Sequence, residues 1–385
     1  MTLQWVSADL RTGRVIADLP GVIPTFPLRR SLGQYETTQA NLILEDSTNP
    51  SWERATQPGA AVLHVYDDAD PLRTPLWSGM VLKQRPAVPG DTVELGEATI
   101  EAYFDRRYVG DVDYSAGSGT GQNTIVTDLI NRYVRDGVEP GLQISVRVVT
   151  AGAGQLRNPT YRDSDNASVY QRLTELMALS GGPEWTVQWA CSPDGKFILP
   201  TFLVGDRIGA AVIAGRSPTA TFELPGSLVS IDRLTDFSSG KGANKVLAYS
   251  SGQGSSTPTA ATAAANFDGR PTFEIRFAPS LSITDSTTLA SFAKQAVAKL
   301  APGQIAVTMS SMLNAKGAPR YGTDFSLGDD VGYYLPARQT LPNGEVVGQL
   351  AFPEGLAGVG RMIAYEFDLQ TFTPILAVPD PLQEN

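Results

Sequence analysis

Residues 168–200 restrict the fold more than any other stretch, because they contain a helix, a glycine stop and two strands joined by a tight turn. Gly181 and Gly182 follow the last apolar residue of the helical pattern, as a left-handed helix end requires. The Ser-Pro-Asp-Gly run at 192–195 combines the preset backbone angle of proline with the freedom of glycine, so it predicts a tight turn. The strand before it would present on one face Trp185, Val187, Trp189 and Cys191. Such a hairpin predicts an α+β segment and argues against a Rossmann-type half.

Helical spacing of apolar residues recurs at three places. Within the stretch above, the helix would be capped by Asn166 or Ser168, and its apolar face would hold Val169, Leu173, Leu176 and Met177. A second helix is predicted near 124–135. A third is predicted to open at Thr284 or Asp285.

Alternating apolar residues predict strands through most of the remaining chain, as at Ala40, Leu42 and Leu44. The predicted fold class is therefore α+β and mostly β, in the order β, α+β, β, α+β, β. The corresponding segments are a first β region at 1–108, an α+β insert at 109–215, a second β region at 216–255 and 304–375, a second α+β insert at 256–303, and a C-terminal tail at 376–385. The small polar residues of 251–266 favour a flexible loop.

Composition narrows the class of protein. The 385 residues are 42% hydrophobic and 18% charged, which favours packed cores in two to four domains. A net charge of −10 argues against a dedicated nucleic-acid binder, whose affinity comes from neutralising phosphates. We expect a protein made in a cytoplasm, because no signal-peptide pattern opens the chain and no apolar run approaches membrane-spanning length.

Nucleophilic or metal chemistry has few residues to draw on. His64 is the only histidine, and its place between Leu63 and Val65 is that of an ordinary strand residue. Cys191 is the only cysteine, so no intramolecular disulfide can form, and its phase in the strand predicts a packed small apolar side chain. A zinc site of several histidines or cysteines is impossible.

Glycine-rich and acidic runs also lack the residues that known motifs require. In GSGTGQ, Gln122 stands where a dinucleotide-binding loop needs its last glycine, and Gly240-Lys241-Gly242 lacks the Ser or Thr of a phosphate loop. A run beginning at Asp111 and Asp113 starts like a calcium loop but continues without its glycine and final glutamate. We therefore expect no cofactor and no metal ion.

Carboxylates are abundant enough that a glycosidase pair stays open as an alternative. They cluster at Asp67, Asp68 and Asp70 and again at Asp329 and Asp330. Clusters of this kind are typical of solvated turns, so we expect a protein that is not an enzyme and has no catalytic residue.

Six short motifs follow one another along the chain. They are a tryptophan strand followed by Asp9 and Thr12-Gly13; Pro75-Leu76-Trp77-Ser78-Gly79; Ala102-Tyr103-Phe104-Asp105-Arg106-Arg107-Tyr108; the 168–200 unit; Gly242-Ala243-Asn244-Lys245-Val246 followed by Ser251-Gly252-Gln253-Gly254; and Phe325-Ser326-Leu327-Gly328-Asp329. In this order they resemble the tail-hub or baseplate-hub family of long-tailed bacteriophages, which in actinobacterial siphophages are minor tail proteins. The resemblance covers nearly the whole chain.

The resemblance implies two small β-barrels, each with an α+β insert, assembled as a homotrimeric ring of pseudo-sixfold symmetry. Such a structural protein sits at the tail tip of the virion, is made in the host cytoplasm, and adapts a hexameric tail tube or distal tail protein to a threefold central spike or fibre. Other minor tail proteins and the tape measure protein are implied partners. Phage DNA would pass through the lumen during ejection without specific binding, and no membrane insertion is implied.

Two further alternatives follow from the residues. One is an envelope-glycan hydrolase that uses a carboxylate pair. The other is a receptor- or carbohydrate-binding tail-tip protein, for which Trp52 is the exposed candidate, because Trp5, Trp77, Trp185 and Trp189 lie in alternating strands and are expected in the core. For the hub itself, the loop 251–266 and the insert 337–360 are the expected contacts with a neighbour.

Overall fold

The computed structural model describes residues 3–68, 70, 72–110, 113–117, 119–135, 140–150, 154–179, 181–213, 217–250, 259–263, 269–279, 286–313, 315, 317–342, 344 and 346–377. The chain divides into two compact units. The first comprises Met1–Ser230 and Ser310–Ile375, and the second comprises Ile231–Met309 and Leu376–Asn385.

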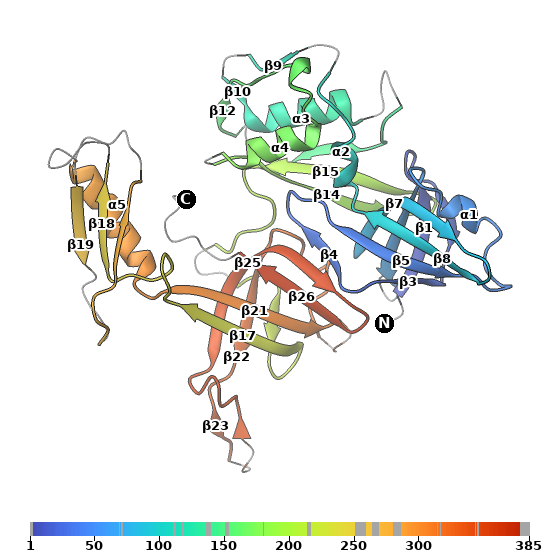
Figure 1. Ribbon diagram of the computed structural model, residues 1–385. Coiled ribbons are helices and arrows are strands. Elements are labelled where there is room, and N and C mark those ends of the chain that lie inside the picture. The colour runs from blue at the N-terminus through green and yellow to red at the C-terminus, as the bar shows by residue number, and fades with distance from the viewer. Residues whose placement is uncertain are drawn as a thin grey trace. The chain divides into compact units, whose positions relative to one another are not determined.

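The first unit opens with a seven-stranded sheet in the order β2-β1-β6-β7-β8-β5-β3 (Figure 1). Its strands are β1 (Leu3–Asp9), β2 (Val15–Asp18), β3 (Val22–Pro24), β5 (Thr37–Ile43), β6 (Ala61–Asp67), β7 (Trp77–Pro86) and β8 (Thr92–Ala98), and a short helix α1 (Trp52–Ala55) precedes β6. All six strand pairings are antiparallel. Trp5 and Trp77 are buried here, as their alternation predicted.

The α+β insert follows with helices α2 (Glu101–Phe104), α3 (Gln122–Tyr133) and α4 (Val169–Met177) and the sheet order β11-β15-β14. The sheet strands are β11 (Ser145–Val148), β14 (Glu184–Cys191) and β15 (Ile198–Gly205). Short elements complete it: β9 (Tyr114–Ser115), β10 (Thr120–Gly121), β12 (Leu156–Arg157), β13 (Thr160–Tyr161) and the 3₁₀ turn Asp163–Asp165.

The unit at 168–200 forms as the sequence predicts. Ser168 is the cap of α4: its hydroxyl accepts from the Gln171 amide at 3.1 Å, and the Gln171 side chain accepts from the Ser168 amide at 3.0 Å. Asn166, the other candidate, instead ends the preceding 3₁₀ turn with a left-handed φ of 50°. Beyond the helix, Gly181 has φ 59°, and β14 and β15 pair antiparallel as a hairpin.

One hydrophobic core joins the first sheet to this insert. It runs from Val6, Ala8 and Val62 on the sheet to Phe104, Trp185, Phe202 and Leu173 on the insert. Trp185 and Phe202 stack with their ring centroids 5.7 Å apart, and Phe104 lies within 6.0 Å of both. The two segments therefore fold as one packed body.

A second sheet has the order β16-β22-β25-β26-β21-β17. Its strands are β16 (Thr221–Glu223), β17 (Leu228–Asp236), β21 (Gln304–Met312), β22 (Asp330–Leu335), β25 (Leu356–Phe367) and β26 (Thr371–Leu376). A seventh strand, β4 (Leu28–Ser31), comes from the N-terminal region and pairs antiparallel with the end of β25. Between β22 and β25, the hairpin β23 (Gln339–Thr340) and β24 (Val346–Val347) projects beyond the sheet (Figure 1).

The second unit is a small three-stranded sheet covered by helix α5 (Ser286–Leu300) (Figure 1). Its order is β19-β18-β20, with β18 (Lys245–Tyr249), β19 (Thr259–Ala263) and β20 (Glu274–Phe277). Val246 and Ala248 pack with Leu289, Ala293 and the other buried residues of α5. The predicted helix is present over its described part, and the proposed first residues, Thr284 and Asp285, lie outside the described residues.

One expectation for this part of the chain is wrong, and it concerns the loop predicted at 251–266. Before that loop, β18 lies in the predicted second β region at 216–255, and in the structure its apolar face packs on α5 and it pairs with β19 and β20. The loop predicted at 251–266 contains strand β19, because backbone pairing with β18 suffices even for a run of small residues. The other positions of that loop, 251–258 and 264–266, lie outside the described residues, as does most of the expected tail at 376–385.

Within the described residues the protein is mostly β with helical inserts, as predicted. No helix among those residues has the length and apolar character needed to cross a membrane.

Candidate functional site

His64 lies in the interior of unit 1, where its side chain makes structural contacts. Its Nδ1 lies 2.7 Å from the Ser78 hydroxyl, and its ring meets the Trp189 ring edge-on at 4.7 Å between centroids. Burial lowers the pKa of His64 from 6.5 to about 3, so the imidazole is neutral at physiological pH. This matches the expected structural strand position.

Cys191 packs at the margin of the shared core and is half-buried. Burial is the main cause that raises the pKa of its thiol, so the thiolate is disfavoured. The predicted packed apolar role is confirmed.

Asp70 and Asp113, from the acidic runs, both accept hydrogen bonds from backbone amides. Asp70 accepts from the amides of Leu72 and Thr74, and Asp113 accepts from the amide of Asp163. Asp111, the other start of the calcium-like run, lies outside the described residues. Among the described residues, no three His, Cys, Asp or Glu side chains lie together in a way that could hold a metal ion.

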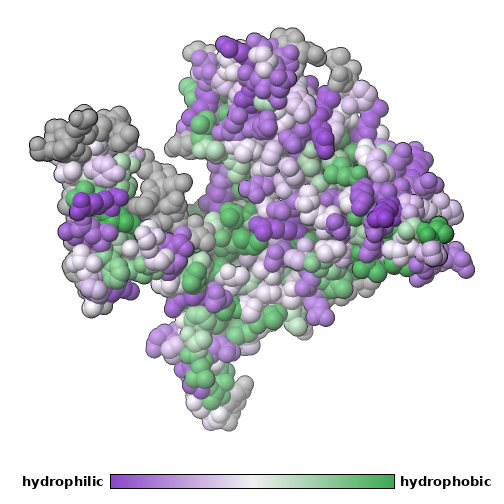
Figure 2. Space-filling model, in the orientation of Figure 1, coloured by the Kyte–Doolittle hydropathy of each residue, from purple (hydrophilic) through white to green (hydrophobic). Residues whose placement is uncertain are grey.

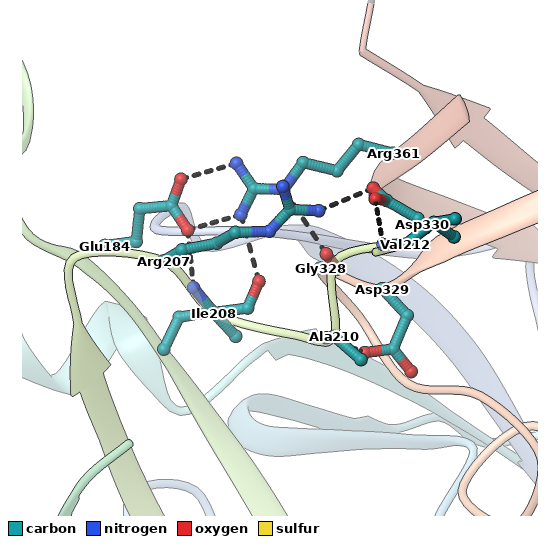
Figure 3. Close-up of polar contacts among 9 residues, drawn as sticks. All are labelled: Glu184, Arg207, Ile208, Ala210, Val212, Gly328, Asp329, Asp330 and Arg361. Atoms are coloured by element: carbon teal, nitrogen blue, oxygen red, sulfur yellow. Dashed lines mark hydrogen bonds and ion pairs between the residues drawn. The ribbon is translucent and has the colours of Figure 1, made fainter. Parts of the chain in front are cut away.

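The richest polar cluster joins the α+β insert to the second sheet (Figure 3). Glu184, at the start of β14, faces the guanidinium of Arg361 on β25 and binds it with both carboxylate oxygens, one of them at 2.5 Å. The same arginine donates to the carbonyl oxygens of Ile208 at 3.0 Å and Gly328 at 3.3 Å. Glu184 also accepts from the Ile208 amide at 2.7 Å, so this ion pair and its hydrogen bonds join four separate backbone segments, at residues 184, 208, 328 and 361.

Two aspartates continue this cluster. Asp330 accepts from Arg207 at 2.5 Å and from the Val212 amide at 2.8 Å. Asp329 is buried and accepts from the Ala210 amide at 2.6 Å. The expectation that these two residues form a solvated turn is wrong, because the segment leaving the insert, residues 206–212, packs against them and uses their oxygens. We call the cluster of Glu184, Arg207, Asp329, Asp330 and Arg361 the insert junction.

A second ion pair, which is buried, joins the first region to the rest of unit 1. Arg30 on β4 donates to Glu101 at 2.9 Å and to the Val187 carbonyl at 2.6 Å, and it is 5% exposed. Burial lowers the pKa of Arg30, but the opposing effect of Glu101, helped by nearby tyrosines, leaves it raised overall. Beside it, the Tyr365 hydroxyl donates to the Leu76 carbonyl at 2.6 Å. These contacts connect β4, α2, β14 and β25, so they fix the relative positions of both seven-stranded sheets and the insert.

Neither cluster was foreseen as a site. Arg30 lies 71 residues from Glu101, and Glu184 lies 177 residues from Arg361, so no local pattern links the partners. The only signal for the insert junction is the Leu327-Gly328-Asp329 strand entry, which we identified as a motif without assigning a role. In both clusters each carboxylate accepts a hydrogen bond from a fixed donor. This arrangement suits a rigid scaffold.

Exposed apolar side chains indicate which surfaces favour contact with another protein. Trp52 is half-buried at the start of α1, so the expectation of an exposed tryptophan in a loop is wrong. In contrast, the part of the second sheet that lies in unit 1 carries large apolar side chains that are 46 to 51% exposed, which are Val229, Met312, Tyr334 and Val359. Figure 2 shows hydrophobic patches over this sheet and over the β23–β24 hairpin. The hairpin adds Val346 at 51% and Leu350 at 76%.

Solved structures similar to this chain include some that span nearly its whole length. A chain of the lidless PdpA–VgrG complex superposes with a TM-score of 0.50 and 8% identity, covering 98% of this chain and 65% of that one. The two chains share a fold. No family model matches the chain, and neither does any curated protein.

Two solved tail proteins are also similar over most of their length. The 43 kDa tail protein of prophage MuSo2 from Shewanella oneidensis has a TM-score of 0.47 and 12% identity, with 99% of this chain and 94% of that chain covered. The tail protein from Neisseria meningitidis MC58 has a TM-score of 0.45 and 12% identity, with 99% and 93% covered.

Proposed function

We propose that this chain is a structural hub of a bacteriophage tail tip. In this proposal its two seven-stranded sheets form two small β-barrels, and three copies assemble into a pseudo-sixfold ring. The ring joins a hexameric tail tube or distal tail protein to a threefold spike or fibre, contacts other minor tail proteins and the tape measure protein, and leaves a channel for DNA.

The observation that carries the proposal is a fold match over 98% of the chain, together with six short motifs whose order along the chain resembles that of the tail-hub family. Two of these motifs have a structural role here. The Leu327-Gly328-Asp329 motif provides two acceptors of the insert junction, the Gly328 carbonyl and the Asp329 carboxylate. The strand that contains Trp77 lies beside β4, and the Trp77 indole donates to the Arg29 carbonyl at 3.1 Å.

The surface of the second sheet supports assembly. Its apolar side chains are exposed in the isolated chain, and contact with another copy would remove them from water. A closed symmetric ring is an arrangement that buries such a surface.

The net charge of the chain supports a role as a channel for DNA. The chain carries a net charge of −10, and a channel lined by acidic surface repels the phosphate backbone of DNA. Such a channel lets the genome pass without specific binding.

Sedimentation velocity of the purified protein and of two variants tests the assembly. Val359→Asp places a charge among the exposed apolar residues of the second sheet and is expected to shift the trimer to a monomer. Val88→Asp, at a residue 97% exposed in the first region, is the matched control and should leave the trimer intact. A wild-type trimer that Val359→Asp leaves intact would exclude this sheet as the interface.

A further inference from the structure

A polar groove lies where the N-terminal strands meet the turn of the β14–β15 hairpin, and it shares no lining residue with either ion-pair cluster. Its volume is about 700 Å³, and its walls include Arg14, Arg54, Ser51, Gln143 and Phe197. That volume is within the usual range of ligand sites and suits several residues of an extended peptide.

Backbone bonds between distant segments make the floor of the groove rigid. The Val15 amide donates to the Lys196 carbonyl at 2.9 Å, and the Ile198 amide donates to the Gly13 carbonyl at 2.8 Å. Gly13 has φ 69°, and a Cβ there would lie 2.5 Å from the Ile198 oxygen, so only glycine permits this approach. The groove is therefore formed before any partner binds.

The cationic side chains of the groove are available to pair with a ligand. Arg14 and Arg54 are exposed, and neither belongs to an ion pair among the described residues. The one acidic residue of the groove, Asp9, is already engaged: its Oδ1 accepts from the amide and the hydroxyl of Thr12, both at 2.8 Å. Ser51 precedes α1 without capping it through its side chain, so its hydroxyl is available to a ligand.

We infer that this groove binds a carboxylate-bearing peptide segment of a partner protein. Arg14 and Arg54 would pair with acidic side chains of that segment, while Val15 and the 37% exposed Phe197 would contact its apolar residues. Charge complementarity favours this partner over DNA, because an acidic chain with two local arginines releases too few phosphate counterions for stable DNA binding. The inference goes beyond the hub proposal and does not depend on it, because the groove shares no residue with the exposed apolar surface of the second sheet.

Fluorescence anisotropy of the full chain with a labelled hexapeptide that alternates glutamate and leucine tests this binding. The peptide should bind, more weakly as salt rises, and the double variant Arg14→Gln/Arg54→Gln should raise its Kd at least tenfold. Arg106→Gln, an exposed arginine outside the groove, is the matched control and should leave the Kd unchanged.

Three outcomes would overturn the inference. They are no binding of the acidic peptide at 1 mM, equal binding by the double variant, or equal binding of a peptide with glutamine in place of glutamate. Tighter binding of a single-stranded DNA 20-mer that the double variant abolishes would assign the groove to nucleic acid instead. The sedimentation coefficient of the double variant should equal that of the wild type, so a failure here is distinguishable from a failure of the hub proposal.

Discussion

Gly209 and Gly328 bring two distant backbone segments into direct contact. A Cβ on Gly209 would lie 2.1 Å from the carbonyl carbon of Gly328, and a Cβ on Gly328 would lie 2.4 Å from the carbonyl oxygen of Ile208. Both glycines also have left-handed φ angles, 85° and 95°. The insert junction depends on this contact, because it places the segment after the insert beside Asp329 and Asp330.

Replacing either glycine should destabilise unit 1. Gly209→Ala and Gly328→Ala each add an unfavourable φ, about 1 kcal/mol, and a steric overlap that costs about 1–3 kcal/mol more. Gly59→Ala is the control, since Gly59 also lies in unit 1 and has φ 71° but nothing within 4 Å of its Cβ position. Urea unfolding measures all three, and an equal loss in the control would show that the overlap is unimportant.

The Glu184–Arg361 pair should be far more stabilising than a surface ion pair. Arg361→Gln leaves a partly buried carboxylate without its cation, which we expect to cost about 2–4 kcal/mol in the free energy of unfolding. Arg85→Gln removes the exposed pair with Glu94 and should cost less than about 1 kcal/mol. A double-mutant cycle with Glu184→Gln isolates the coupling, and a coupling near zero would contradict the role of the junction.

Glu97 should make the protein less stable at alkaline pH. It is 3% exposed inside the first sheet, and both carboxylate oxygens lack a hydrogen-bond partner. Burial raises its pKa from 4.5 to about 8, so the folded state retains a proton that the unfolded chain releases. This contribution to stability is complete below pH 4.5 and is lost as pH rises through about 8.

The variant Glu97→Gln removes that titration. Its free energy of unfolding, relative to wild type, should therefore increase by several kcal/mol between pH 5 and pH 9. Glu94→Gln is the control, because Glu94 lies on the same strand and is exposed. A pH profile that is unchanged by Glu97→Gln would show that Glu97 is not protonated in the folded protein.

His64 should remain neutral throughout the physiological range. Because its folded pKa, about 3, is below the unfolded value of 6.5, the chain loses stability as pH falls from 6.5 toward 3. The protein has one histidine, so its imidazole signals in an NMR spectrum need no assignment by mutagenesis. The chemical shifts of those signals should stay constant from pH 8 to pH 5. A titration midpoint near pH 6.5 would mean that water reaches the ring.

The sequence predicts those parts of the fold that depend on local patterns. The capped helix at Ser168, the glycine stop at Gly181 and the hairpin after Trp185 follow from periodicity and turn chemistry, and the structure confirms them. The burial of the strand tryptophans follows from the same alternation.

Contacts between distant segments could not be predicted in the same way. Nothing near Arg29 or Arg30 indicates that β4 pairs with β25, and the pairs Arg30–Glu101 and Glu184–Arg361 join residues without a common pattern. Asp329 and Asp330 follow a glycine and so resemble a surface turn, although the segment after the insert covers them. The domain boundaries drawn at residues 108, 215, 255 and 303 stay predictions.

The central claim is a trimeric hub, and native mass spectrometry of the purified protein with negative-stain class averages of the same sample tests it most directly. The account predicts a mass of about 123 kDa, three times the 41.1 kDa of the chain, and a ring with pseudo-sixfold appearance and a central hole. A compact monomer of 41.1 kDa at every concentration, with no ring in the images, would contradict it.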